Sequence, residues 1–166
     1  MLICETERLI VRKFTLDDAP FIMTLLNSPN WIEFLGDRNI HTVADAALYL
    51  SNGPLASYTQ REFGLYLVAL KDTNVPIGMS GLIKRDGLEH VDVGFALLPE
   101  YTGQGYAYEA TKAVLDYGYN TLRLPHIVAI ARADNKNSVA LLEKLGMKFS
   151  DNIMLLGIEH PLCLFK

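Results

Sequence analysis

The sequence of 166 residues predicts an α+β domain on a mixed, mostly antiparallel sheet. Short runs rich in Val, Ile, Leu and Phe alternate with helix signals along the chain. Three of these runs, at 63–70, 76–84 and 89–98, follow one another with only tight turns between them, so they are expected to pair antiparallel. A helix then separates the third run from a fourth, and a connection of that kind joins parallel strands.

The N-terminal part is expected to form one strand, at 9–14, and two helices. Thr15-Leu16-Asp17-Asp18 and Thr42-Val43-Ala44-Asp45 have the spacing of a capping box, in which a hydroxyl and a carboxylate satisfy free amides at a helix start. The boxes predict one helix that includes 21–26 and a second that ends near Ser51. The aromatic-rich segment 31–38 has no clear period and is interpreted as a connection.

The C-terminal part begins with a helix at 105–120 and a short buried strand at 126–131. A helix at 138–145 follows, and Gly146 ends it. Two strands, near 148–156 and 162–166, close the chain. The predicted order is β-α-α-β-β-β-α-β-α-β-β, and because no repeat or linker interrupts it, one domain is expected over residues 1–166.

Composition and charge narrow the class of protein. The net charge of −4 and the absence of a basic surplus argue against nucleic acid or an anionic membrane as a partner. No signal peptide is recognised, and no apolar run approaches the roughly 20 residues of a membrane span. Cys4 and Cys163 are too few for a disulfide framework, which indicates a reduced, cytoplasmic protein. The four histidines are scattered, so no metal site is expected.

The most informative stretch is 92–107, where a strand runs into a glycine turn and the turn into a helix. Gly103 and Gly105 tolerate positive φ, so successive amides can converge on one anion, and the helix N-terminus adds partial positive charge. This favours a phosphate site that needs no Lys or Arg, although a plain junction with glycines for tight packing is the alternative. Neither a Walker loop nor a dinucleotide fingerprint fits, because the Gly-Lys-Ser/Thr end is missing and Tyr108 stands where a third glycine is needed.

Further motifs occur in order along the chain. They are Asp92-Val93-Gly94-Phe95, Glu100-Tyr101-Thr102-Gly103-Gln104-Gly105, Asn135-Lys136-Asn137-Ser138 and Glu143-Lys144-Leu145-Gly146-Met147. With these motifs, from Glu5 to about Phe149, the chain resembles the GNAT superfamily of acetyl-CoA-dependent N-acetyltransferases, and most of all its ribosomal-protein N-terminal acetyltransferase (RimJ/RimL-like) branch. It departs from the usual pattern in having Glu, Thr and Gln at positions 100, 102 and 104, where Arg or Gln, Trp and Lys are common.

The resemblance implies a GNAT-like acyl-CoA N-acyltransferase fold, flanked by about four helices, whose sheet splays between the fourth and fifth strands. Acetyl-CoA, the acetyl donor, would lie in that cleft, and no metal would take part. Alternatives stay open for three parts of it, namely a plain core strand with a glycine kink for 92–98, N-capping for Ser138 and a solvated lysine for Lys144. The acetyl-CoA residues implied are Phe95, Leu97, Leu98, Thr102, Gly103, Gln104, Gly105, Tyr106, Ala107, Asn135, Ser138 and Lys144.

The reaction implied is direct transfer to a primary amine, either a protein N-terminus or a small molecule. The amine must lose a proton before it attacks, and a carboxylate can accept that proton directly or through water. Asp92 is the first candidate for this base, with Glu89 and His90 as runners-up. Ser138 would bond the thioester sulfur or protonate the leaving thiolate, and a backbone N–H of the splayed strand would meet the oxyanion.

The acceptor is expected to enter past an apolar, acidic-edged wall. Trp31 and Phe34, with Glu33 and Asp37, could form it, although a hydrophobic cluster under the loop is the alternative for Trp31. A catalytically weak CoA- or nucleotide-binding module of the same fold is the alternative function, and the missing third glycine argues against a nucleotide-dependent oxidoreductase. The chain is expected to be a monomer or a homodimer.

Overall fold

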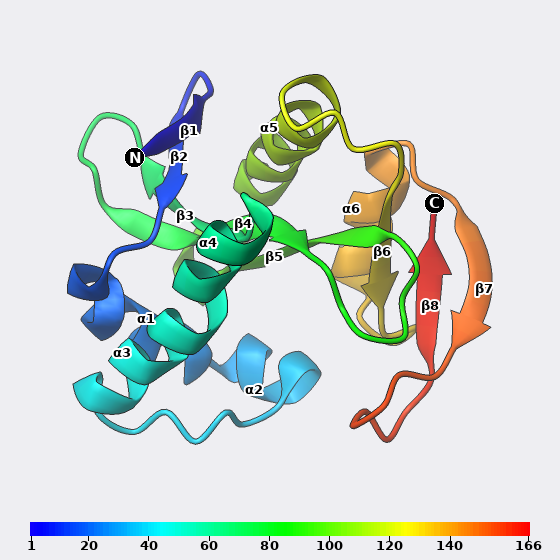
Figure 1. Cartoon of the computed structure of the whole chain (residues 1–166), viewed down its shortest axis with the longest axis horizontal. Helices are drawn as coiled ribbons and strands as arrows, with labels where there is room; N and C mark the ends of the chain where they lie inside the picture. The colour runs from blue at the N-terminus through cyan, green and yellow to red at the C-terminus, as the bar shows by residue number, and fades with distance from the viewer.

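The computed structural model describes residues 1–166 and contains one mixed eight-stranded sheet (Figure 1). The strand order is β1-β2-β3-β4-β5-β6-β8-β7, and only β5 and β6 run parallel. The predicted α+β fold class is confirmed. The strands are β1 (Leu2–Glu5), β2 (Leu9–Lys13), β3 (Leu65–Leu70), β4 (Pro76–Ile83), β5 (Val91–Leu97), β6 (Ile127–Ala131), β7 (Phe149–Ile153) and β8 (Leu162–Phe165).

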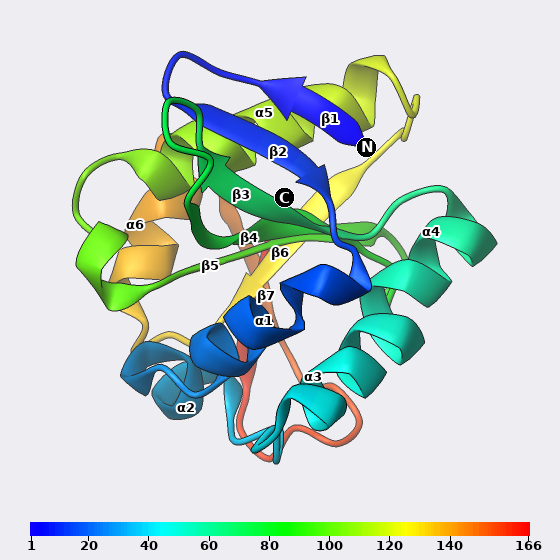
Figure 2. The ribbon, with the colours of Figure 1, turned by 90° about the vertical axis from the view of Figure 1, so that its left-hand side faces the viewer.

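Helices cover both faces of the sheet (Figure 2). One face packs against α1 and α3 in a cluster that includes Phe14, Leu67 and Met79. The other packs against α5 and α6 in a larger cluster that includes Val93, Val114 and Leu142. None of the helices has the length and apolar character that crossing a membrane requires. The helices are α1 (Ala19–Leu26), α2 (Pro29–Leu35), α3 (Val43–Leu50), α4 (Ala56–Arg61), α5 (Tyr106–Asn120) and α6 (Lys136–Lys144).

Three elements were not expected from the sequence. The N-terminal edge strand β1 pairs with β2 and makes the splayed strands the fifth and sixth in chain order rather than the fourth and fifth. The aromatic segment after Pro29 is helical as α2, so its interpretation as a connection is wrong; its seven residues are too few to show a period. The chain also stays helical from α3 into α4, because a wider π turn at 51–55 accommodates Pro54.

The parallel pairing of β5 and β6 is short, and the point where it ends determines where the candidate site lies. Only Val91↔Ile127 and Asp92↔Val128 are in register between β5 and β6. Beyond Val128, β6 pairs with β8 through Ala129↔Phe165, whereas β5 continues to Leu97 against β4 alone. The two strands therefore diverge from Asp92 towards the glycine turn.

Candidate active site

The diverging part of β5 offers an edge of main chain. Residues 93–97 have β4 on one side and no strand on the other, so their outer N–H and C=O groups are free to bond a ligand. The side chains of Phe95 and Leu97 pack on the α5 side, and those of Ala96 and Leu98 pack on the α1 side. A ligand in the opening would therefore meet backbone, flanked by apolar side chains.

The glycine turn follows directly. A short 3-10 turn at Pro99–Tyr101 leads to Gly103 and Gly105, with φ of +74° and +84°. Both values lie in the left-handed region that glycine adopts without strain. Gly105 is the N-cap of α5 and brings no side chain to cap it, so the first amides of this helix keep their bonding capacity. Such a helix start suits an anion.

The side chains of the turn are used within the turn itself. Thr102 Oγ1 donates to the Pro99 carbonyl at 2.7 Å, and Gln104 Nε2 donates to the Glu100 carbonyl at 3.0 Å. Tyr106 and Ala107 begin α5 and are half-buried. The structure thus brings the predicted residues 102–107 together as a backbone-lined turn, without a basic side chain among them.

A cation does reach this turn from the other end of the chain. Arg8 Nη1 donates to the Gln104 carbonyl at 3.0 Å, Arg8 Nε bonds Glu109 Oε1 at 2.8 Å, and the guanidinium lies 4.3 Å from the centroid of the Tyr106 ring. Burial raises the pKa of Glu109, but hydrogen bonds from Thr6 and Arg8 hold it below its ordinary value. Sequence reasoning missed Arg8 because 96 residues separate it from its partner at position 104.

The start of α6 resolves one open alternative. Asn135 is the N-cap, and its Oδ1 accepts from the Ser138 backbone N–H at 3.4 Å. Capping therefore belongs to Asn135, and the half-buried Ser138 hydroxyl has no hydrogen-bond partner within the chain. At the other end of α6, the Lys144 ammonium lies 4.3 Å from the centroid of the Tyr108 ring. A groove over α5 joins Lys144 and Tyr108 to Gly105 and Arg8.

Asp92 lies where the parallel pairing ends. Its side chain is only 1% exposed, and Oδ1 accepts a hydrogen bond from Arg85 Nε at 3.0 Å. Burial raises the pKa of Asp92, and the positive charge of Arg85 opposes that rise. Because alternate strand residues share a face, Asp92 lies on the same face as Gly94 and Ala96, which is the face covered by α1 and α3. Arg85 itself was not anticipated, because the sequence places it in a tight turn.

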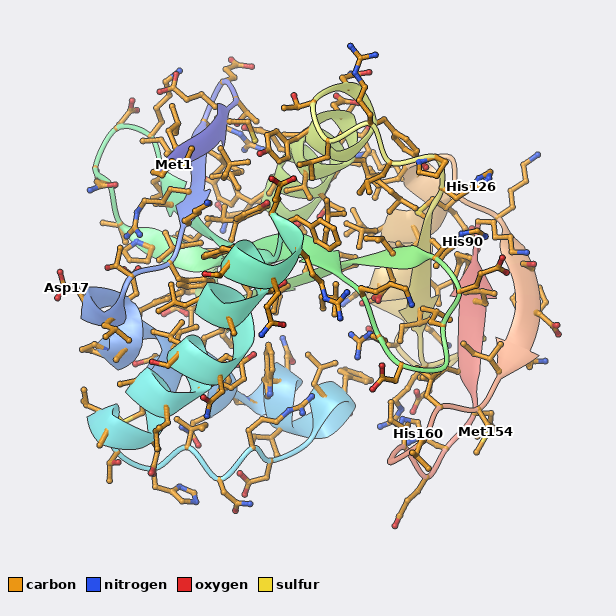
Figure 3. All side chains as sticks on the ribbon, in the orientation of Figure 1. Met1, Asp17, His90, His126, Met154 and His160 are labelled. Carbon is orange, nitrogen blue, oxygen red and sulfur yellow. The ribbon has the colours of Figure 1, made fainter.

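Glu89 and His90 are placed differently. The Glu89 side chain is 88% exposed, and its Oε2 lies 3.9 Å from His90 Nε2. His90 also packs against His126, with ring centroids 4.8 Å apart, where β5 and β6 begin (Figure 3). Both residues thus lie at the paired end of these strands, away from the glycine turn.

Trp31 and Phe34, which were expected to form one acceptor wall, lie in different environments. Trp31 is 7% exposed and belongs to the cluster under α1 and α3, which agrees with the cluster alternative. Phe34 is half-buried, and the Arg132 guanidinium lies 5.6 Å from its ring centroid. Arg132 also donates to the Glu33 carbonyl at 3.0 Å, so α2 is tied to the end of β6. No group of three or more His, Cys, Asp or Glu side chains could hold a metal ion.

Comparisons with known proteins agree with this geometry. The family model for the acetyltransferase (GNAT) domain matches residues 8–148. The uncharacterized N-acetyltransferase YnaD of Bacillus subtilis is 26% identical over 143 residues, 86% of this chain and 81% of that protein. Spermidine N(1)-acetyltransferase of Escherichia coli is 29% identical over 79 residues, 45% of this chain and 42% of that protein. RimL, a ribosomal L7/L12 alpha-N-protein acetyltransferase solved with coenzyme A, shares the fold at a TM-score of 0.84 and 15% identity, covering 99% and 96% of the two chains.

Proposed function

The chain belongs to the GNAT acetyltransferase family, and we propose that it moves an acetyl group from acetyl-CoA directly to a primary amine. The acceptor would be a protein N-terminus or a small molecule, and both kinds occur in the names of similar proteins. The observation that carries the proposal is the two-residue pairing of β5 and β6, which opens a main-chain edge leading to the glycine turn.

Acetyl-CoA would lie along that edge. Its pantetheine arm would pair with the backbone of 95–98, and its pyrophosphate would bond the amides of 102–107, where α5 starts. Asn135 would border the pantetheine arm, and Lys144 would approach the adenosine phosphates across α5. This placement needs no surplus of basic residues, in agreement with the net charge of −4.

The reaction requires an acceptor for the proton of the amine, a hydrogen-bond donor to the oxyanion and a proton for the leaving thiolate. Asp92 would take the proton of the amine through a water molecule, because its carboxylate is too buried for direct contact. As the C–N bond forms, a backbone N–H of β5 would stabilise the oxyanion, and the C–S bond would then break. The Ser138 hydroxyl, free of partners in the chain, would donate to the leaving sulfur.

The remaining elements of the proposal concern the setting of the enzyme. Residues 1–166 would act as one domain, as a monomer or a homodimer. Cys4 and Cys163 are both free thiols, which fits a reducing, cytoplasmic compartment.

The test is release of coenzyme A thiol from acetyl-CoA over a panel of amines. Stimulation by at least one amine, with the acetylated amine found by mass spectrometry, is the expected result. Binding of acetyl-CoA without stimulation by any amine or peptide N-terminus would instead favour the catalytically weak binding module.

A further inference from the structure

The charges around Asp92 bear on the class of acceptor. We infer that the acceptor amine carries a carboxylate, and that Arg85 binds this carboxylate beside Asp92. The inference rests on the proposed acetyltransferase function, and it opposes the acidic-edged wall expected from the sequence.

Arg85 has unused bonding capacity beside Asp92, the proposed base. Only its Nε bonds Asp92, at 3.0 Å, and neither terminal guanidinium nitrogen has a partner within the chain. The side chain is 33% exposed, so these nitrogens can meet a solute. Two guanidinium N–H groups bind a carboxylate in a forked, bidentate geometry. The Arg85–Asp92 pair can therefore present donors to a carboxylate and, through a water molecule, an acceptor to the proton of the neighbouring amine.

A groove next to Asp92 is lined by positively charged residues, of the same sign as Arg85. It lies between α3, α4 and the strands β3 and β4, and it includes Ile83, which pairs in register with Asp92. The only charged residues among those lining it are Arg61 and Lys84. Lys84 Nζ donates to the carbonyls of Arg85 and Leu88 and forms no ion pair, although its positive charge also acts on Asp92.

Tyr49 of α3, which also lines the groove, is close enough to Arg85 and to one further cation, Arg38, to be affected by their charges. Burial raises the pKa of Tyr49, and the positive charges of Arg38 and Arg85 act against that rise. The chain as a whole carries a net charge of −4, so this concentration of cations is local. Asp92 is already paired with Arg85 and also faces the charge of Lys84, so a single buried carboxylate serves more than one cation.

These charges separate two classes of acceptor. A polyamine would bring more positive charge into a region whose one buried carboxylate is occupied, and such repulsion lowers affinity. An amine that carries a carboxylate would supply the missing negative charge and place its nitrogen near Asp92. Free α-amino acids and peptides with an acidic residue near the N-terminus share this chemistry.

The experiment measures kcat/KM by thiol release with matched acceptors. Serine and serinamide form one pair, Ser-Asp-amide and Ser-Asn-amide form the other, and spermidine is the polyamine. The enzymes are the wild type, Arg85→Gln, Arg85→Lys and the control Arg123→Gln, which removes an exposed arginine that has no ion pair. The two amines of a pair differ in basicity, so the acid-to-neutral ratio of kcat/KM is compared between enzymes.

We expect Arg85→Gln to lower that ratio about tenfold, mainly through KM for the acidic acceptor. Arg85→Lys should retain part of the ratio, and Arg123→Gln should leave it unchanged. The pair that responds identifies a free amino acid or an acidic peptide as the source of the carboxylate. An unchanged ratio in Arg85→Gln, or spermidine as the best wild-type acceptor, would overturn the inference while leaving the acetyltransferase function intact. Failure of every amine to release thiol would overturn both.

Discussion

Replacement of Asp92 by asparagine tests the proposed chemistry most directly. The substitution keeps the size of a side chain that is 1% exposed, but it removes the charge that accepts the proton and pairs with Arg85. If Asp92 is the base, the variant must bind acetyl-CoA normally and fail in the step that deprotonates the amine.

The expected loss of activity is large compared with the loss of stability. A positioned general base contributes about 10²–10⁴-fold to a rate, so kcat should fall by at least about 10²-fold. Arg85 loses its charged partner but remains 33% exposed to solvent, and the buried charge of Asp92 is itself unfavourable, so the free energy of unfolding should change by no more than about 1 kcal/mol. For a chain of this size that corresponds to about 2–4 °C in Tm.

The pH dependence gives a second readout. Burial raises the pKa of Asp92 above its ordinary value of 3.8, so wild-type kcat should fall as the pH drops through this raised pKa. The variant should lack that acid limb. The folded protein also binds a proton at a pH where the unfolded chain is still ionised, so the wild type gains stability relative to Asp92→Asn as the pH falls through the folded-state pKa.

The assay combines thiol release, with an acceptor amine of low pKa, and thermal unfolding between pH 4 and 7. Glu89→Gln is the matched control, because Glu89 is a nearby carboxylate that is exposed. Unchanged kinetics in Asp92→Asn would refute its role as base. A loss confined to Glu89→Gln would move the role to that residue.

Three further substitutions test other parts of the site and its scaffold. Gly105→Ala and Gly103→Ala each force an alanine into left-handed backbone, at a cost of about 1–2 kcal/mol. Only the added Cβ at position 105 would also approach a guanidinium nitrogen of Arg8, at 3.3 Å. The KM for acetyl-CoA should therefore rise more for Gly105→Ala than for Gly103→Ala in steady-state assays. Asp18→Asn breaks a buried pair with Arg12, with bonds of 2.8 and 2.9 Å, and should cost about 3 kcal/mol in urea unfolding at pH 7. Since the Arg12 bonds lower the pKa of Asp18 despite its burial, this difference should shrink as the pH falls towards that pKa. Ser138→Ala should lower kcat without changing Tm, because the hydroxyl has no partner in the chain; an equal fall in Tm would contradict a role at the sulfur.

Local signals in the sequence were sufficient for much of the fold. The capping box at Thr42 is present, with its hydroxyl accepting from the Asp45 backbone N–H at 3.0 Å. The three consecutive strands pair antiparallel as predicted, and the helix after the glycine turn begins at Tyr106. These features depend on neighbours within a few residues, which a single sequence contains.

Contacts between segments that are far apart in the sequence could not be predicted from such local signals. The edge strand β1 is short and gains its order from pairing with β2. In the candidate site, the glycine turn was predictable from its spacing, whereas the approach of Arg8 to it depends on tertiary packing. The pairing of Asp92 with Arg85 likewise follows from how a turn folds back over a strand, which composition and period do not encode.

The two register pairs at Val91 and Asp92 also form a narrow link between two parts of the sheet. They are the only strand pairing between the five N-terminal strands and the unit of β6, β8 and β7. Few backbone bonds therefore join the two parts, and the packing of α5 together with the bond from Arg132 to the Glu33 carbonyl supplies further contacts between them. Gly118 of α5 approaches Ile127 so closely that an added Cβ would lie 2.6 Å from its Cδ1. The packing of α5 across this short pairing therefore helps to hold the two parts of the sheet at their present spacing.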